Sequence, residues 1–198
     1  MVFIWNKKAT IVNPTTYTKN PQIVWSQYIR IENKPINYLE IGVHKGLNLI
    51  DIANSYCKHP NSRMYLVDPW IDYDDYPEYK GQQDVLFGIF NNNVKPYIDK
   101  CFLHRGFSDD IVPTFSQNFF DIIYVDGNHE TEYVYRDGKM AFEKVKPGGY
   151  IVFDDYNDLW LQTVKGINMF LNEYSGKIRI LTSRNNAWQL ILQKLTSP

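Results

Sequence analysis

The sequence predicts one α/β domain with a mostly parallel β-sheet and helices on both faces. Short, near-continuous apolar runs alternate with longer segments whose apolar residues recur at helical spacing. Strands that are apolar on both sides are typical of a parallel sheet that helices cover on both faces. The length of 198 residues, of which 44% are hydrophobic, suits a single domain over residues 1–198.

Each element follows from an apolar run and from the residues that stop it. The first predicted strand ends at Gly42, the second at Asp68-Pro69 and the fourth at Asp126-Gly127. Lys146-Pro147-Gly148-Gly149 is expected to end the helix before the fifth strand. An Arg-Asn-Asn turn joins the last two strands in a hairpin, which adds an antiparallel edge. The expected strands are 36–41, 64–67, 101–104, 119–125, 150–153, 177–181 and 188–192, and the expected helices are 46–57, 131–145 and 159–171.

Two segments lie outside this alternation and are rich in aromatic residues. Residues 1–35 carry many Tyr, Trp, Thr and Asn, and residues 70–98 combine aromatic with acidic residues. Ligands of such sheets bind outside the carboxyl ends of the strands. Both segments are long enough to cover those ends, so we expect each of them to act as a lid.

The charge balance argues against several classes of protein. The net charge is −1, from 21 Lys and Arg against 22 Asp and Glu, so no basic excess exists to hold a nucleic acid. No run approaches the roughly 20 apolar residues of a membrane helix, and the apolar start is too short for a signal peptide. Two cysteines make neither a disulfide framework nor a zinc cluster. We therefore expect a cytoplasmic protein that binds neither nucleic acid nor membrane.

The first chemical motif runs from Glu40 to Gly46, where a strand ends in an acid and a glycine-containing turn opens a helix. Glycine lets the backbone approach a ligand closely, and the start of a helix presents N–H groups. Asp68 follows at the end of the second strand, where a carboxylate can accept both hydroxyls of a ribose. The alternatives are an ordinary strand-to-helix turn and a loop aspartate before Pro69.

These motifs resemble those of the class I S-adenosylmethionine-dependent methyltransferases, over residues 36–194. The resemblance implies a Rossmann-like, seven-stranded sheet with an antiparallel C-terminal strand. It also implies S-adenosylmethionine as the cofactor, held at the first turn, by the acid after the second strand and by the segment after the third. By this resemblance, the cofactor-binding residues are Glu40, Gly42, His44, Gly46, Asn48, Asp68, Ser108, Asp109 and Asp126.

A second set of acids follows the fourth and fifth strands. Asp126, Asp154 and Asp155 would repel one another at neighbouring strand ends, and a hard divalent cation neutralises such a group with oxygen ligands. The pattern resembles the metal-dependent O-methyltransferases of the catechol, caffeoyl-CoA and sugar types. That resemblance implies that the three residues bind Mg²⁺ or another divalent cation, which activates a substrate hydroxyl. The alternative is that Asp154 and Asp155 only cap the next helix.

His129 is assigned as the general base, with Asp126 beside it as the other catalytic residue. It stands three residues after Asp126, where the catechol type has a lysine that accepts the hydroxyl proton. The sugar type uses an aspartate two residues after the first metal ligand, and this chain has Asn128 there. An imidazole with a pKa of about 6.5 suits proton transfer at neutral pH. The alternatives for His129 are a locally bonded residue at a helix start and a fourth metal ligand.

The function that the resemblance implies is transfer of a methyl group to a hydroxyl of a small molecule. The first choice of acceptor is a sugar or nucleotide-sugar, and the second is a catechol or other phenol. Two alternatives stay open: a metal-independent methyltransferase and a non-catalytic binding module of the same fold. A dinucleotide oxidoreductase is disfavoured because the glycines lack the spacing of that motif. A homodimer is expected only by resemblance to the family.

Overall fold

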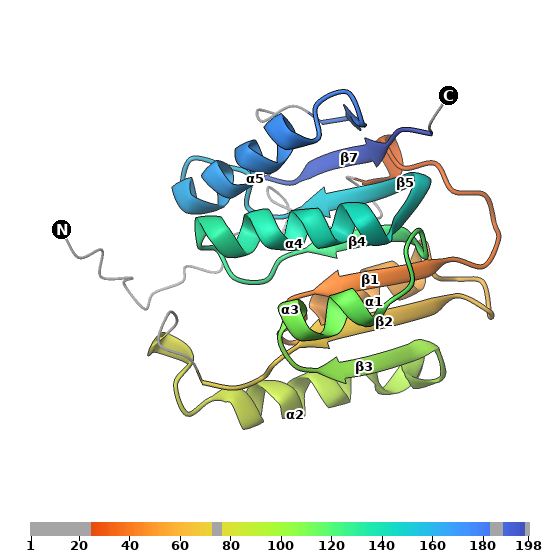
Figure 1. Ribbon diagram of the computed structural model, residues 1–198. Coiled ribbons are helices and arrows are strands. Elements are labelled where there is room, and N and C mark those ends of the chain that lie inside the picture. The colour runs from red at the N-terminus through yellow and green to blue at the C-terminus, as the bar shows by residue number, and fades with distance from the viewer. Residues whose placement is uncertain (1–24, 73–76, 183–187, 197–198) are drawn as a thin grey trace.

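A seven-stranded β-sheet forms the centre of the computed structural model, which describes residues 25–72, 77–182 and 188–196 (Figure 1). The strands are β1 (Asn37–Ile41), β2 (Arg63–Asp68), β3 (Cys101–Arg105), β4 (Phe120–Val125), β5 (Val145–Phe153), β6 (Ile178–Ile180) and β7 (Leu190–Lys194). Their order is β3-β2-β1-β4-β5-β7-β6. Strands β1 to β5 are parallel, and β7 is antiparallel to both β5 and β6. The predicted sheet, with its antiparallel C-terminal edge, is confirmed.

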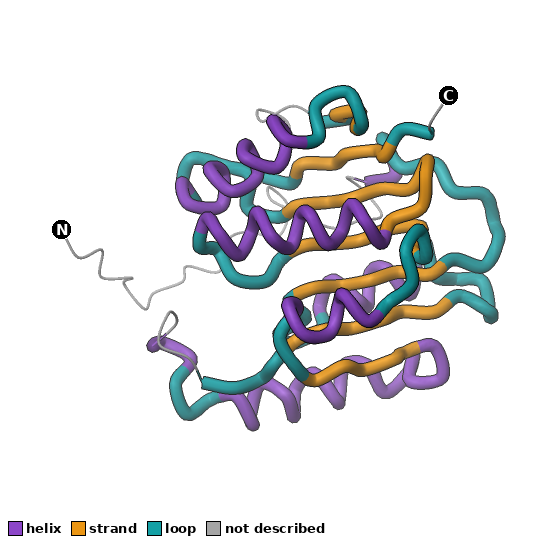
Figure 2. The backbone as a smooth tube through the Cα atoms, in the orientation of Figure 1, coloured by secondary structure: helices purple, strands orange, loops and turns teal. Residues whose placement is uncertain are grey.

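Helices cover both faces of the sheet, as Figure 2 shows. One face carries α1 (Leu47–Asn54) and α2 (Gln83–Val94), and the other carries α3 (Ser108–Ile111), α4 (Thr131–Lys144) and α5 (Leu161–Glu173). Successive residues of a strand enter the two cores in turn, as Tyr38 and Leu39 do in β1. Among the helices of the described ranges, none combines the length and apolar character that a membrane crossing needs.

The carboxyl ends of the parallel strands meet at one edge of the sheet, where the arrowheads of β1 to β5 point in Figure 1. The hydrogen-bond ladder continues one residue past three of these strands. Gly42 N donates to Val67 O, Asp126 N to Ile41 O and Asp154 N to Val125 O, at 2.8 to 3.0 Å. These bonds hold the first residue after each strand beside its neighbour, so the polar strand ends form one continuous edge.

Strand β5 begins earlier than predicted. The predicted stop at Lys146-Pro147-Gly148-Gly149 lies inside the strand, because Val145 already pairs with Phe120 of β4. The register of the pair shifts beyond Phe120, and Gly148 has a φ of +79°. The chain therefore turns from α4 into β5 without a loop. The turn predicted between the last two strands lies outside the described residues.

The lid predicted for residues 70–98 is wrong over α2. This helix is the crossover between β2 and β3, and it buries Leu86, Phe90 and Val94 in the core. Of the lid predicted for residues 1–35, the first 24 residues lie outside the described ranges. Trp25 is fully buried and packs in the same core as α1 and α2. Trp25 and the buried residues of α2 thus support the sheet face. Tyr79, ahead of α2, packs on His44 in the turn after β1.

Candidate active site

The turn after β1 packs directly against the end of β4. Gly42 has a φ of +82°, and a Cβ atom there would lie 2.0 Å from the backbone oxygen of Asp126. Gly46, with a φ of +70°, immediately precedes α1. Glycine adopts this backbone conformation without steric cost, and no side chain fits at Gly42. The glycines of the first motif therefore bring the turn, the start of α1 and Asp126 together at one edge.

Glu40 is a buried acid in β1, beside this turn. Its Oε2 accepts hydrogen bonds from the Tyr38 hydroxyl at 2.7 Å and from Asn48 Nδ2 at 3.3 Å. Burial raises the pKa of Glu40 to about 8, although the two hydrogen bonds act in the opposite direction. A cation bound beside Glu40 would favour its ionised form. The structure thus brings together Glu40 and Asn48, two of the residues predicted to bind the cofactor.

Asp68, the last residue of β2, is hydrogen-bonded to the turn after β1. Its Oδ2 accepts hydrogen bonds from the backbone N–H groups of Val43 and His44, each at 2.9 Å. Its Oδ1 accepts one from Trp70 N, also at 2.9 Å. A carboxylate offers about four acceptor sites, and the described residues use three of them. Asp68 therefore has a structural role that the sequence did not predict, while an acceptor site on Oδ1 remains for a ligand hydroxyl.

Helix α4 holds the segment that follows β3. Ser108 Oγ donates a 2.6 Å hydrogen bond to Asp137 Oδ1, and Asp109 pairs with Arg136 at 2.9 Å. Burial raises the pKa of Asp137 to about 7. A Cβ atom on Gly127 would lie 3.2 Å from Asp137 Oδ2, so this acid reaches the residue after Asp126. Ser108 and Asp109, both predicted to bind the cofactor, are therefore anchored near the end of β4.

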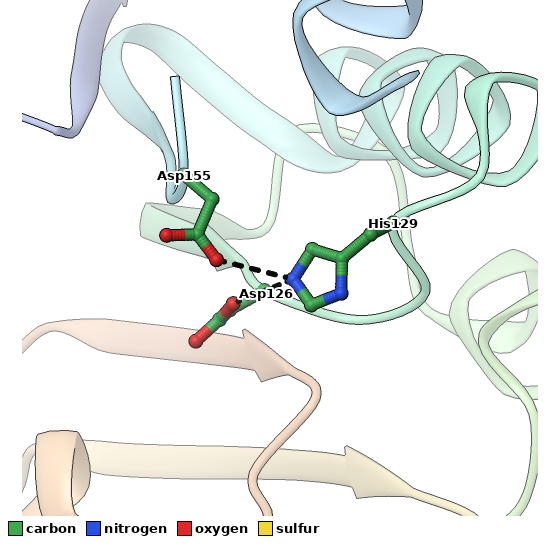
Figure 3. Close-up of side chains that lie close together, drawn as sticks. All are labelled: Asp126, His129 and Asp155. Atoms are coloured by element: carbon green, nitrogen blue, oxygen red, sulfur yellow. Dashed lines mark ion pairs between the residues drawn. The ribbon is translucent and has the colours of Figure 1, made fainter. Parts of the chain in front are cut away.

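Asp126, His129 and Asp155 form a cluster outside the ends of β4 and β5 (Figure 3). His129 Nε2 lies 3.6 Å from Asp126 Oδ1 and 3.3 Å from Asp155 Oδ2. The His129 ring stacks on Trp160, with the ring centroids 4.4 Å apart. Burial by itself lowers the pKa of His129, but hydrogen bonding to the two carboxylates outweighs burial and raises the pKa to about 9. One ligand atom from each residue lies within 4.8 Å of the others, so one cation could contact all three.

Asp154 immediately follows β5 and precedes Asp155. It is buried, and its Oδ2 accepts a 2.8 Å hydrogen bond from the Tyr124 hydroxyl. The same hydroxyl lies 3.3 Å from Asp126 Oδ2. Asp155, the next residue, has a left-handed φ of +53°. The Tyr124 hydroxyl thus joins Asp154 to Asp126, and the three predicted acids lie together outside the ends of β4 and β5.

Three residues of this edge were not among the predicted site residues. Tyr124 stands two residues before Asp126 on the same side of β4, so the strand periodicity could have revealed it. Trp160 and Asp137 come from a loop and a helix, and their approach depends on tertiary packing. Asn128, which cannot replace the aspartate of the sugar type, accepts a 2.7 Å hydrogen bond from Glu130 N at the start of α4.

The chain belongs to the family described as methyltransferase domain, whose sequence profile matches residues 39–156. This range contains the glycine turn, Asp68 and the cluster of Asp126, His129 and Asp155. The prediction of a class I methyltransferase is thereby confirmed.

One relative is an uncharacterized protein of Acanthamoeba polyphaga mimivirus, which is 30% identical over 130 residues. The match covers 64% of this chain and 54% of the relative. The chain therefore spans about half the length of that protein.

Solved methyltransferase structures share the fold. The O-methyltransferase TomG of Streptomyces achromogenes, in complex with S-adenosylmethionine, is 17% identical with a TM-score of 0.58, over 81% of this chain and 73% of TomG. The O-methyltransferase NovP is 16% identical with a TM-score of 0.62, over 83% of this chain and 74% of NovP. A putative rRNA-methylase of Clostridium thermocellum is 13% identical with a TM-score of 0.63, over 87% of this chain and 92% of that chain. At these identities the likeness establishes the fold alone.

Proposed function

We propose that the protein transfers a methyl group from S-adenosylmethionine to a hydroxyl of a small molecule. The observation that carries this proposal is the close approach of Gly42, in the turn after β1, to Asp126, which clusters with His129 and Asp155. A cofactor at the turn and a hydroxyl at the cluster would be neighbours, because the Gly42 backbone touches Asp126. Holding two reactants in line in this way contributes up to about 7–11 kcal/mol to catalysis. Membership of the methyltransferase domain family supports the reaction type.

The proposed cofactor site lies along the ends of β1 to β4. Glu40 offers a buried carboxylate that suits a cationic cofactor, and Asp68 retains an acceptor site that suits a ribose hydroxyl. Ser108 and Asp109 border the same edge from the β3 side. The proposed cofactor-binding residues are Glu40, Gly42, His44, Gly46, Asn48, Asp68, Ser108, Asp109 and Asp126.

A divalent cation fits the donor set of the cluster. Asp126 and Asp155 are like charges close to one histidine nitrogen, and carboxylate oxygens are the ligands that Mg²⁺ prefers. A bound cation of this kind supplies a Lewis acid that lowers the pKa of a substrate hydroxyl. We propose Asp126 and Asp155 as the ligands that face the cation. Asp154, predicted as the third ligand, accepts a hydrogen bond from the Tyr124 hydroxyl, which also lies near Asp126.

His129 is the proposed general base. Its raised pKa of about 9 means that the imidazole carries a proton at neutral pH while Asp126 and Asp155 face it. Positive charge bound to these two acids would favour the neutral imidazole instead, which can accept a hydroxyl proton at Nε2. Stacking on Trp160 restricts the ring in that position.

The proposed acceptor is a hydroxyl of a sugar or nucleotide-sugar. Trp160 places an aromatic ring next to His129, and aromatic rings pack on the apolar faces of sugars. Leu159 and Leu161, on either side of Trp160, are largely exposed. Such an apolar flank also suits a phenol, which is the second choice of acceptor.

A metal-independent methyltransferase is the second candidate function. The observation in its favour is that His129 Nε2 already lies within 3.6 Å of both carboxylates, with a raised pKa of about 9. A protonated imidazole there balances part of the negative charge that a cation would otherwise balance. In this case His129 would act as a positive group at the site.

The test is methyl transfer from methyl-labelled S-adenosylmethionine to a panel of sugars, nucleotide-sugars and phenols, with Mg²⁺ and with EDTA. We expect turnover that requires Mg²⁺ and that Asp155→Asn abolishes. Asp158→Asn, which changes an exposed acid of the same loop, is the matched control and should keep full turnover. Turnover that EDTA leaves unchanged would support the metal-independent function. Failure of the protein to bind S-adenosylhomocysteine would contradict both candidates.

A further inference from the structure

A line of four buried polar side chains runs from the first described residue to the acids of the candidate site. Trp25 Nε1 donates a 2.7 Å hydrogen bond to Gln189 Oε1, and Gln189 Nε2 donates one of 3.3 Å to the Tyr124 hydroxyl. Tyr124 in turn donates its 2.8 Å hydrogen bond to Asp154 Oδ2. All four residues are at most 4% exposed. This relay of Trp25, Gln189, Tyr124 and Asp154 joins three parts of the chain that are far apart in the sequence, beneath the ends of β4 and β5.

The direction of each hydrogen bond in the relay is fixed by the donor at its start. The indole nitrogen of Trp25 can only donate, so the amide oxygen of Gln189 must face it. The amide nitrogen of Gln189 then donates to the Tyr124 oxygen, which has a single proton of its own to give. That proton is therefore directed to the carboxylates: Asp154 Oδ2 at 2.8 Å, with Asp126 Oδ2 at 3.3 Å as the second acceptor in reach.

Packing and backbone contacts hold the members of the relay in place. The Trp25 ring lies against the Tyr124 ring, with the centroids 5.6 Å apart. Thr182 Oγ1 donates to the backbone oxygen of Gln189 and accepts from the backbone N–H of Ile191, which fixes the start of β7. A hydroxyl held in this way bridges two acids that would otherwise repel each other. It also restricts the orientation of both carboxylates.

We infer that Tyr124 is a positioning residue for the acids of the candidate site, and that Gln189 and Trp25 fix the direction of its hydroxyl. This inference rests on the proposed function, because it assigns Tyr124 to the same acids. Hydrogen-bonding partners behind the ligands of a metal commonly change its affinity by 10- to 100-fold. Tyr124 therefore influences cation binding without touching the cation, and Trp25 connects the N-terminal part of the chain to the site.

The first experiment is calorimetric titration of Mg²⁺, and of Mn²⁺, into the full-length protein saturated with S-adenosylhomocysteine. We expect Tyr124→Phe to weaken cation binding roughly 10- to 100-fold while S-adenosylhomocysteine binding in EDTA stays unchanged. Gln189→Leu and Trp25→Phe should weaken it in the same direction by less. Tyr150→Phe is the matched control, since its buried hydroxyl faces the backbone of Arg30 instead of the acids. Wild-type cation affinity in Tyr124→Phe would overturn the inference.

A second experiment keeps the inference separate from the metal part of the proposed function. Thermal unfolding in EDTA is measured for Tyr124→Phe, Asp154→Ala and the double variant. We expect the two changes in melting temperature to be non-additive, because each variant removes the same hydrogen bond. Additive changes would overturn the relay whether or not a cation binds. Wild-type protein that binds S-adenosylhomocysteine but no cation would refute the metal part of the proposed function, and the double variant would then decide the inference alone.

Discussion

Replacing Glu40 by glutamine should remove a pH dependence of cofactor binding. Burial raises the pKa of Glu40 to about 8, so this carboxyl is mostly protonated at pH 6 to 7. S-adenosylmethionine carries a positive sulfonium, which favours the ionised carboxylate. Binding must therefore remove the proton of Glu40. Affinity should rise as the pH rises toward 8 and level off above it.

The size of the effect follows from the raised pKa. If only the ionised form binds, each pH unit below a pKa of about 8 lowers the affinity about tenfold, which is about 1.4 kcal/mol. Affinity should then be roughly 50-fold higher at pH 8 than at pH 6. This is the upper limit, because any binding to the protonated form makes the dependence shallower. Glu40→Gln has no proton to lose at this position and should lack this dependence.

The assay is calorimetric titration of S-adenosylmethionine into both proteins at pH 6, 7, 8 and 9. The amino group of the cofactor titrates in the same way in each experiment, so the difference between the two profiles isolates Glu40. Glu130→Gln changes an exposed acid before α4 and serves as the control. A wild-type profile that runs parallel to that of Glu40→Gln would refute the reasoning.

Three further predictions concern the same edge of the sheet. Gly42→Ala should strongly lower the melting temperature, because its Cβ would lie 2.0 Å from Asp126 O. Gly88→Ala is the control, because a Cβ there would meet no atom within 4 Å, and it should leave the melting temperature unchanged. Equal melting temperatures of the two variants would contradict this prediction. Asp155→Ala should remove the heat of Mg²⁺ binding in calorimetry, and an unchanged heat would exclude it as a ligand. Asp137 has a pKa of about 7 in the folded protein and an ordinary pKa of about 3.8, so between these values the folded protein holds a proton that the unfolded chain has lost. The wild-type protein should therefore lose up to about 4 kcal/mol of unfolding free energy as the pH rises from 4 to 8. Urea unfolding should show a smaller loss of unfolding free energy for Asp137→Asn over this pH range. An equal loss in the variant and the wild type would contradict the raised pKa of Asp137.

Local sequence signals were sufficient to predict most of the sheet. Strands β1, β2 and β4 each combine an apolar run with a stop of glycine or aspartate, and their bounds differ from the predicted ones by one residue at most. Helix α2 was missed although Leu86, Phe90 and Val94 have helical spacing, because the aromatic and acidic residues of this segment indicated a lid. The start of β5 depends on its pairing with Phe120, which no local signal contains.

The candidate site was predictable where it follows from strand order. Asp126 and Asp155 meet because β4 and β5 are neighbours in a parallel sheet and end at the same edge. The hydrogen bond between Tyr124 and Asp154 was not predictable, because it depends on side-chain packing between β4 and the end of β5. Gln189, which donates a hydrogen bond to the Tyr124 hydroxyl, lies 65 residues further along the chain, so no local signal indicates this contact.

The most direct test of the central claim is a calorimetric titration of S-adenosylhomocysteine into the purified protein, first with Mg²⁺ and then with EDTA. We predict saturable binding in the micromolar range in both conditions, and a separate heat of Mg²⁺ binding that Asp155→Ala abolishes. A wild-type protein that shows no S-adenosylhomocysteine binding in either condition would contradict the proposed methyl transfer.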